Sequence, residues 1–177
     1  REQAAICGAV LAARAARMIY LNKTCYNGLW RVNSRGHFNV PAGRYRNPPI
    51  LDAGRLRAAA AALQGVDLAA CDFRAVVDEA RPGDFVYFDP PYVPLSQTAS
   101  FTSYAREDFG EAEQCALAEV FRALDRKGVR VMLSNADAPL VHALYRGFRI
   151  EIVQARRAIN SRAARRGAIS EVVVLNA

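Results

Sequence analysis

The chain has 177 residues and a net charge of +7, from 24 Lys and Arg against 17 Asp and Glu. Because 52% of its residues are hydrophobic, the composition excludes a disordered chain, a collagen-like repeat and a disulfide scaffold, and it predicts a packed globular protein. Charged residues interrupt each long apolar stretch before it reaches the roughly 20 residues of a membrane-spanning helix, so we expect no membrane partner.

The cysteines and histidines argue against a metal centre. The four cysteines lie at least 18 residues apart with no C-x-x-C pair, and the two histidines are remote from each other. No signal-peptide pattern is present. We therefore expect no bound metal, and reduced, mostly buried thiols in a cytoplasmic protein.

Charge is segregated along the chain. From Gln3 to Leu51 there is no Asp or Glu but there are seven cations, and residues 149–166 hold six arginines against Glu151. With +7 for the whole chain and +12 for these two segments together, the remaining residues carry −5. Aromatic residues interleave with the first set of cations, which is typical of surfaces that bind nucleic acid. An Arg-rich solvated surface explains the charge alone equally well.

The first part of the chain predicts two helices separated by a long ordered loop. Apolar residues at helical spacing predict a helix over residues 4–19. Residues 22–49 are rich in Asn, Gly, Pro and aromatic residues, and a loop of this length in a compact domain is usually functional. Asp52 is placed to cap a helix that runs to about Gln64, and residues 66–70 are expected to form a short strand.

The second part alternates strands with helices. An amphipathic helix over residues 111–124, ended by Gly128, follows a buried-strand pattern. A short helix to Tyr145, with Asp137 as N-cap and Pro139 in its first turn, follows the next strand. The predicted strands lie at residues 84–88, 129–134, 148–153 and 171–175. This order predicts an α/β sheet that ends in a hairpin.

The sequence Asp89-Pro90-Pro91-Tyr92 directly follows the first of these strands, where open α/β sheets bind their ligands. Two prolines stiffen the backbone and donate no hydrogen bond, so the Pro90 carbonyl is left to accept one beside the Asp89 carboxylate. These acceptors suit the two N–H donors of an amino group on a planar ring, with Tyr92 stacked on that ring. A strand-ending turn is the alternative for four residues taken alone.

Longer segments agree with the amino-group interpretation. Residues 20–31 (YLNKTCYNGLWR), Gly36 and residues 38–45 (FNVPAGRY) resemble the DNA-recognition segment of the Dam-type DNA adenine methyltransferases, whose motif after the catalytic strand is also DPPY. Further matches lie at residues 94–104, at Leu133-Ser134-Asn135 and at Arg156-Arg157 through Ile159. The resemblance covers nearly the whole chain.

This resemblance implies a partial S-adenosylmethionine-dependent methyltransferase sheet of Rossmann-like α/β type with an inserted DNA-recognition segment. Residues 1–64 would be the helical and loop segment that recognises DNA, and residues 65–177 the C-terminal part of the catalytic domain. The implied reaction is methyl transfer from S-adenosylmethionine to the exocyclic amino group of an adenine in duplex DNA. The base must be flipped because that amino group is otherwise paired and shielded.

The resemblance also assigns roles to individual residues. Asp89 and Pro90 would bind the amino group and Tyr92 would stack on the flipped adenine, while Asp72, Phe73 and Asp89 would line the cofactor site. Tyr26 and Asn27 would press on the base stack. An arginine such as Arg31 suits guanine in the major groove, and arginines near the last strand suit backbone phosphates. The full set of implied DNA contacts is Tyr26, Asn27, Leu29, Arg31, Asn39, Pro41, Arg44, Arg156 and Arg157.

Family members carry a glycine-rich cofactor loop upstream of such a segment, whereas the eleven glycines here are never closer than seven residues. The chain also opens at Arg1 rather than Met, so we expect the C-terminal two thirds of an enzyme whose N-terminal segment is missing. The enzyme is expected to act as a monomer on double-stranded DNA, in a bacterium or phage, in a housekeeping or restriction-modification role. The recognition segment looks most like that of members that methylate GATC.

Two alternatives from other classes remain. Without the cofactor loop, the chain could be a non-catalytic DNA-binding remnant. A related tetrapeptide also occurs in methyltransferases that act on RNA or on protein glutamine. Asp rather than Asn at position 89 argues against the glutamine enzymes, and the recognition segment argues against RNA.

Overall fold

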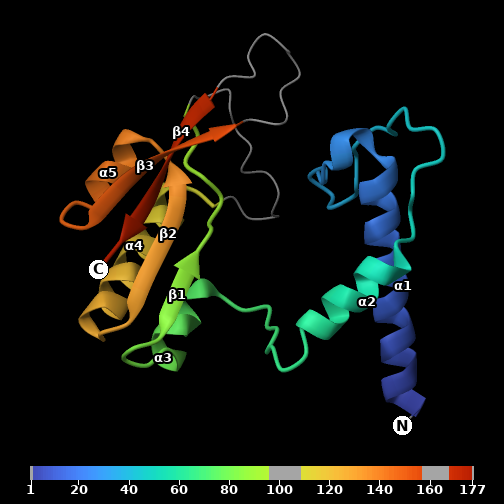
Figure 1. Ribbon diagram of the computed structural model, residues 1–177, viewed down its shortest axis with the longest axis horizontal. Helices are drawn as coiled ribbons and strands as arrows, with labels where there is room; N and C mark the ends of the chain where they lie inside the picture. Colours follow the sequence, from blue (N-terminus) through green and yellow to red (C-terminus); the bar gives the residue numbers. More distant parts are fainter. Residues whose placement is uncertain (1, 96–108, 157–167, 177) are drawn as a thin grey trace. The chain divides into compact units, whose positions relative to one another are not determined.

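The computed structural model describes residues 2–95, 109–156 and 168–176. The chain divides into two compact units, Arg1–Ala69 and Ala70–Ala177 (Figure 1). Within the described residues, no helix is both long and apolar enough to cross a membrane. The functional roles assigned above to residues 1–64 and 65–177 stay predictions.

The first unit is built from two helices and the loop between them. Helix α1 spans Glu2–Thr24 and runs past its predicted end because Thr24 Oγ1 and the Cys25 N–H still donate to carbonyls one turn earlier. A short turn, η1 (Tyr26–Gly28), follows. Helix α2 spans Ala53–Ala62 and begins as predicted, because Asp52 Oδ1 accepts the Arg55 N–H at 2.9 Å.

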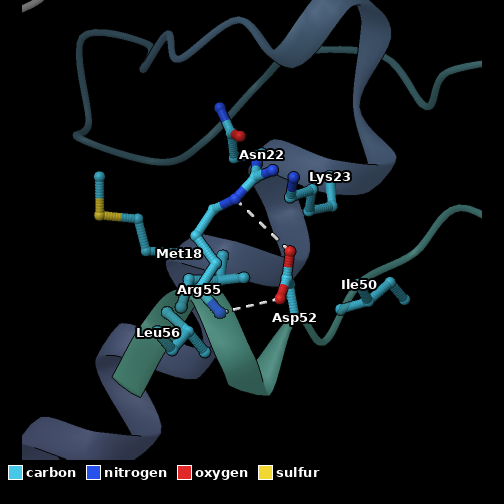
Figure 2. Close-up of a pocket in the computed structure, with 8 residues that line it drawn as sticks. Met18, Asn22, Lys23, Ile50, Asp52, Arg55 and Leu56 are labelled. Carbon is cyan, nitrogen blue, oxygen red and sulfur yellow. Dashed lines mark hydrogen bonds and ion pairs between the residues drawn. The ribbon is translucent and has the colours of Figure 1, made fainter. Parts of the chain in front are cut away.

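A hollow of about 400 Å³ lies beside the start of α2 (Figure 2). Asp52 lies between the backbone nitrogen of Arg55 and its guanidinium, whose Nε is 3.5 Å from the carboxylate. Met18 and Lys23 of α1 and Leu56 of α2 also line the hollow. None of the predicted site residues is among its lining residues, so it contributes nothing to the predicted chemistry.

The prediction of a strand at residues 66–70 is wrong. The segment is irregular, and the side chains of Val66 and Leu68 are 49% and 76% exposed. A strand needs a neighbouring strand to satisfy its backbone groups, and the described residues provide none here.

The second unit contains one four-stranded sheet in the order β1-β2-β4-β3. Strands β1 and β2 are parallel, and β4 runs antiparallel between β2 and β3. The strands span Phe85–Phe88 (β1), Arg130–Ala136 (β2), Arg149–Arg156 (β3) and Ala168–Leu175 (β4). The predicted α/β sheet with a closing hairpin is confirmed. Because β1 and β2 are parallel, their carboxyl ends meet at one edge of the sheet.

Helix α4, Glu111–Arg126, lies along β2 (Figure 1) and buries the predicted apolar face. Its side chains pack with those of β2, β4 and α5 into the core of this unit. Gly128, at φ +77°, reverses the chain after α4 as predicted. The remaining elements are η2 (Phe73–Ala75), α3 (Val76–Glu79) and α5 (Pro139–Leu144).

Three local predictions need correction. Ala138, not Asp137, is the N-cap of α5, because the Asp137 carboxylate is instead 2.7 Å from Nε2 of His142. Strand β1 is not fully buried, since its alternate side chains are exposed and the strand lies at the edge of the described sheet. Of the three thiols whose surroundings are described, Cys25 is buried but Cys71 and Cys115 are exposed.

Candidate functional site

The edge where β1 and β2 end carries a connected set of polar side chains. Phe88 pairs with Leu133, so the residues that follow them, Asp89 and Ser134, are neighbours. Ser134 Oγ donates to Asp89 Oδ1 at 2.7 Å, and the Tyr87 hydroxyl donates to Ser134 Oγ at 2.9 Å. Asp89 is thereby held through one of its two carboxylate oxygens.

Two acceptors remain open beside this anchored oxygen. The Asp89 side chain is exposed, and within the described residues no donor is hydrogen-bonded to its Oδ2 or to the Pro90 carbonyl. Neither proline of the motif has an N–H with which to occupy neighbouring acceptors. The strand end therefore carries two oxygen acceptors, on consecutive residues, that have no donor among the described residues.

Tyr92 supplies an aromatic ring next to these acceptors. Its side chain is half-buried and packs against the core of the second unit. Burial raises the pKa of the Tyr92 phenol, and hydrogen bonding to Ser134 opposes this only in part. The ring therefore stays neutral at physiological pH, as a stacking surface should.

The backbone on either side of Tyr92 is bound by two buried amides. Gln114 Nε2 of α4 donates to the Pro91 carbonyl at 2.8 Å, and Asn135 Oδ1 of β2 accepts the Val93 N–H at 2.9 Å. The two amides are joined by a 3.1 Å hydrogen bond from Asn135 Nδ2 to Gln114 Oε1. The motif after β1 is thus tied to two elements at once.

The residues predicted to line the cofactor lie at η2 in the same unit. Asp72 accepts the Arg74 N–H at 2.8 Å and the Arg74 guanidinium at 2.9 Å, and these bonds, the backbone one foremost, lower the pKa of the Asp72 carboxyl. The guanidinium also lies 4.6 Å from the centre of the Phe73 ring. In the described part of the chain no hydrogen bond connects Asp72 with Asp89.

In the first unit, the predicted recognition segment folds back on itself around Arg31. The Val32–Phe38 bridge and the bond from the Asn39 N–H to the Arg31 carbonyl bring these two polar residues together. Arg31 Nε donates to Asn39 Oδ1 at 2.9 Å, and Arg31 Nη2 donates to the Asn39 carbonyl at 3.0 Å. Of the five N–H groups of the guanidinium, two bond Asn39, and the described residues provide no acceptor for the other three.

Tyr26 and Asn27 lie at a tight turn directly after α1. Asn27 adopts φ +54°, a left-handed conformation that Asn tolerates, and its N–H donates to the Tyr45 hydroxyl at 3.1 Å. The Tyr26 side chain is 50% exposed, while its N–H donates to the Pro41 carbonyl. Backbone bonds thus hold an exposed aromatic ring on the segment surface.

The other predicted DNA contacts of this segment divide into exposed and packed residues. Arg44 and Pro41 are exposed, whereas Leu29 is half-buried and its carbonyl accepts the Cys25 thiol at 3.1 Å. Trp30 packs on Phe38, with ring centres 5.1 Å apart. The structure thus brings together seven predicted residues, from Tyr26 to Arg44, in one unit.

Comparison with known proteins identifies the family of the chain. Residues 4–159 match the family described as D12 class N6 adenine-specific DNA methyltransferase. The chain belongs to this family. It is 46% identical over 165 residues to the type II methyltransferase M1.LlaDCHI of Lactococcus lactis subsp. cremoris, covering 92% of this chain and 58% of that protein.

Two further relatives show the same coverage. The type II methyltransferase M.MjaIII of Methanocaldococcus jannaschii is 46% identical over 165 residues, covering 92% of this chain and 57% of the relative. The DNA adenine methylase of Escherichia coli is 37% identical over 162 residues, covering 92% and 58%. The chain therefore spans somewhat more than half the length of these relatives.

Some of the predicted residues are not placed. Arg156 ends β3, and only its backbone is described. Arg157 lies outside the described residues, as do Ser96 to Tyr104 of the resemblance. The implied contacts of Arg156 and Arg157 with DNA phosphates stay predictions.

Sequence reasoning missed the side chains that support the motif. Ser134 and Asn135 were recognised only as a family match, without a role, and Gln114 and Tyr87 were not singled out. A signal for Gln114 existed, because it lies on the apolar face of the predicted helix with Leu117 and Phe121. A polar residue on such a face needs a buried hydrogen-bond partner.

Proposed function

We propose that this chain carries the target-base site and the DNA-recognition surface of an adenine-specific DNA methyltransferase that acts as a monomer on duplex DNA. The observation that carries the proposal is the Asp89 carboxylate, anchored to Ser134 through one oxygen and open at the other beside the Pro90 carbonyl. Membership of the D12 class supports the same reaction.

The two open acceptors suit the exocyclic amino group of adenine. That nitrogen has two N–H donors, and its lone pair is normally delocalised into the purine ring. When Asp89 Oδ2 and the Pro90 carbonyl each accept one N–H, the geometry that frees the lone pair for attack is favoured. Tyr92 stacks on the ring and holds the flipped base in place.

The methyl donor of this reaction is S-adenosylmethionine, which supplies an electrophilic methyl group on a positively charged sulfur. Residues of the second unit offer negative charge and an aromatic ring to such a group. Asp89 offers an exposed carboxylate to a cationic ligand, Asp72 is ionised and its side chain is 59% exposed, and Phe73 offers a half-buried ring. If Asp72 binds the methyl donor, it gives up its hydrogen bond to the exposed Arg74 guanidinium.

The geometry of Arg31 supports recognition of a base edge. Asn39 occupies its Nε side, so the outward N–H groups of Nη1 and Nη2 form the fork that pairs with O6 and N7 of guanine in the major groove. Tyr26, exposed at the turn before it, is the proposed wedge against the base stack. GATC is the proposed site, because residues 20–45 resemble those of GATC-methylating members.

The test is transfer of labelled methyl from S-adenosylmethionine to unmethylated duplex DNA that contains GATC, by the protein that carries this chain. Label is expected on adenine, and Asp89→Ala is expected to abolish transfer with DNA affinity within about twofold of the unmodified protein. Arg35→Ala, a cation of the same segment outside the proposed contacts, is the matched control and keeps transfer.

Three results would contradict the proposal. If Asp89→Ala transfers methyl as well as the unmodified protein, Asp89 is not the acceptor of the amino group. If neither protein transfers label but duplex DNA is bound with sequence preference, the chain is a DNA-binding remnant. Binding to single-stranded RNA in preference to duplex DNA would favour an RNA substrate.

A further inference from the structure

Gln114 and Asn135 are the two side-chain amides that are buried in the described part of the second unit. Gln114 on α4 is 2% exposed and Asn135 on β2 is 0% exposed. Burying an amide is unfavourable unless its donors and acceptors find partners. Both residues find partners, and two of these, the Pro91 carbonyl and the Val93 N–H, lie in the segment that follows Asp89.

The hydrogen bonds form one continuous chain. The Gln114 side chain reaches the Pro91 carbonyl, accepts from Asn135, and Asn135 in turn accepts the N–H groups of Val93 and Ala136, the latter at 2.8 Å. The two backbone groups on either side of Tyr92 are therefore both fixed by side chains. Pro90 and Pro91 have no N–H, so neither of these two residues can be tied to the sheet through a backbone donor.

We propose that Gln114 and Asn135 are positioning residues that set the plane of the Tyr92 ring and the direction of the Pro90 carbonyl for methyl transfer. This inference rests on the proposed function. Holding the backbone at 91 and 93 fixes the Cα of Tyr92 between them, and hence the direction from which its ring meets a flipped base. A displacement of about 1 Å at a reacting centre costs on the order of a hundredfold in rate.

The direction of the amides makes the inference testable with isosteric changes. Gln114 presents Nε2 to the Pro91 carbonyl and Oε1 to Asn135, so reversing its amide would set carbonyl against carbonyl. Gln114→Glu keeps the shape but replaces the donor to Pro91 with an oxygen. Asn135→Asp keeps the acceptor for the Val93 N–H but replaces the donor to Gln114 with a carboxyl oxygen.

The experiment measures kcat and KM for duplex DNA, and the fluorescence of 2-aminopurine placed at the target adenine, in the protein that carries this chain. For Gln114→Glu we expect kcat to fall at least tenfold with KM for DNA within twofold. Bound 2-aminopurine should be brighter than in the unmodified complex, because an ill-placed Tyr92 stacks on it less. Asn135→Asp is expected to show the same changes in smaller measure.

Val120→Ala is the matched control, since Val120 is 7% exposed on the same helix but belongs to the apolar core. It should lower the melting temperature while kcat and the fluorescence of the folded complex stay unchanged. An equal loss of kcat in Val120→Ala at equal loss of stability would show that α4 acts only as general packing.

Unchanged kcat and fluorescence in Gln114→Glu would also overturn the positioning role. If Gln114→Glu does not fold, Asn135→Asp decides by the same two readouts. Failure of the proposed function is distinguishable, because the unmodified protein would then neither transfer label nor extrude the 2-aminopurine, and the inference would fall with it.

Discussion

The bond between Ser134 and Asp89 allows a prediction whose size follows from its geometry. Ser134→Ala removes the donor 2.7 Å from Asp89 Oδ1 and also the acceptor of the Tyr87 hydroxyl, whereas the backbone pairing of β1 with β2 is unaffected. The Asp89 carboxylate then rotates without its anchor, so both oxygens compete for water and the open acceptor loses its fixed direction. The effect should appear in the chemical step rather than in DNA binding.

The size of the expected fall in rate depends on the charge of the Asp89 carboxylate and on its exposure to water. A hydrogen bond to a charged group contributes about 1.5–3 kcal/mol. Because Asp89 is exposed, water replaces part of this bond, and the lower end applies. A loss of about 1.4 kcal/mol corresponds to a tenfold fall in rate, so single-turnover methyl transfer should slow by about tenfold. The dissociation constant for duplex DNA should stay within twofold.

Tyr87→Phe provides the graded control. It removes the donor to Ser134 but keeps the bond from Ser134 to Asp89, and the Tyr87 side chain is exposed enough for water to replace the loss. We expect its rate to fall no more than about threefold. A Ser134→Ala rate within twofold of the unmodified protein, or a Tyr87→Phe loss equal to that of Ser134→Ala, would refute the anchoring of Asp89 by Ser134.

Three further predictions follow from contacts elsewhere in the chain. Arg31→Ala should reduce discrimination at one base pair by about 1–3 kcal/mol. Asn39→Ala should reduce discrimination at the same base pair, and the double variant should lose no more than Arg31→Ala alone, as competition binding with singly substituted duplexes would show. Gly43→Ala would place a methyl group 2.2 Å from Cε2 of Tyr45, so duplex affinity should fall while thermal unfolding of the second unit is unchanged. Tyr145→Phe removes a buried hydroxyl that has no partner among the described residues, and the free energy of unfolding in urea should rise by about 1 kcal/mol.

The sequence predicted the elements whose signal is local and repetitive. Helix α4 shows this best, because its apolar residues recur at helical spacing and Gly128 supplies the turn that ends it. The strand at residues 66–70 fails for the opposite reason. An apolar stretch indicates that a strand is possible, but whether it forms depends on a neighbour that the stretch itself does not encode.

The exposure of β1 was misjudged on the same grounds. Its residues read as a continuous apolar run, which is typical of a strand covered on both faces. In the described sheet β1 pairs only with β2, and Phe85 and Tyr87 are 56% and 49% exposed. An apolar composition shows that a strand can be buried, whereas its actual burial depends on the elements that pack against it.

The candidate site divides along a similar line. Asp89, Pro90 and Tyr92 are contiguous, so the chemistry of adjacent acceptors and an aromatic ring is visible in the sequence before any fold is known. Asn39 shows the limit of this reasoning, because its hydrogen bond to Arg31 depends on how the loop folds back and has no signal in the sequence. Its predicted contact with DNA stays a prediction.

The supporting residues are invisible to motif reasoning because they are brought in by pairing. Gln114 lies 23 residues and Asn135 lies 42 residues along the chain from the backbone groups they bind, and only the parallel register of β1 with β2 and the packing of α4 bring them together. Their common sign is a polar residue in a position that burial should reserve for an apolar one. A buried polar side chain is stable only when its donors and acceptors are hydrogen-bonded. A polar residue on a predicted core face therefore indicates a hydrogen-bond partner nearby, which here is the backbone on either side of Tyr92. In this chain that backbone is the segment with Pro90 and Pro91, neither of which has an N–H to donate.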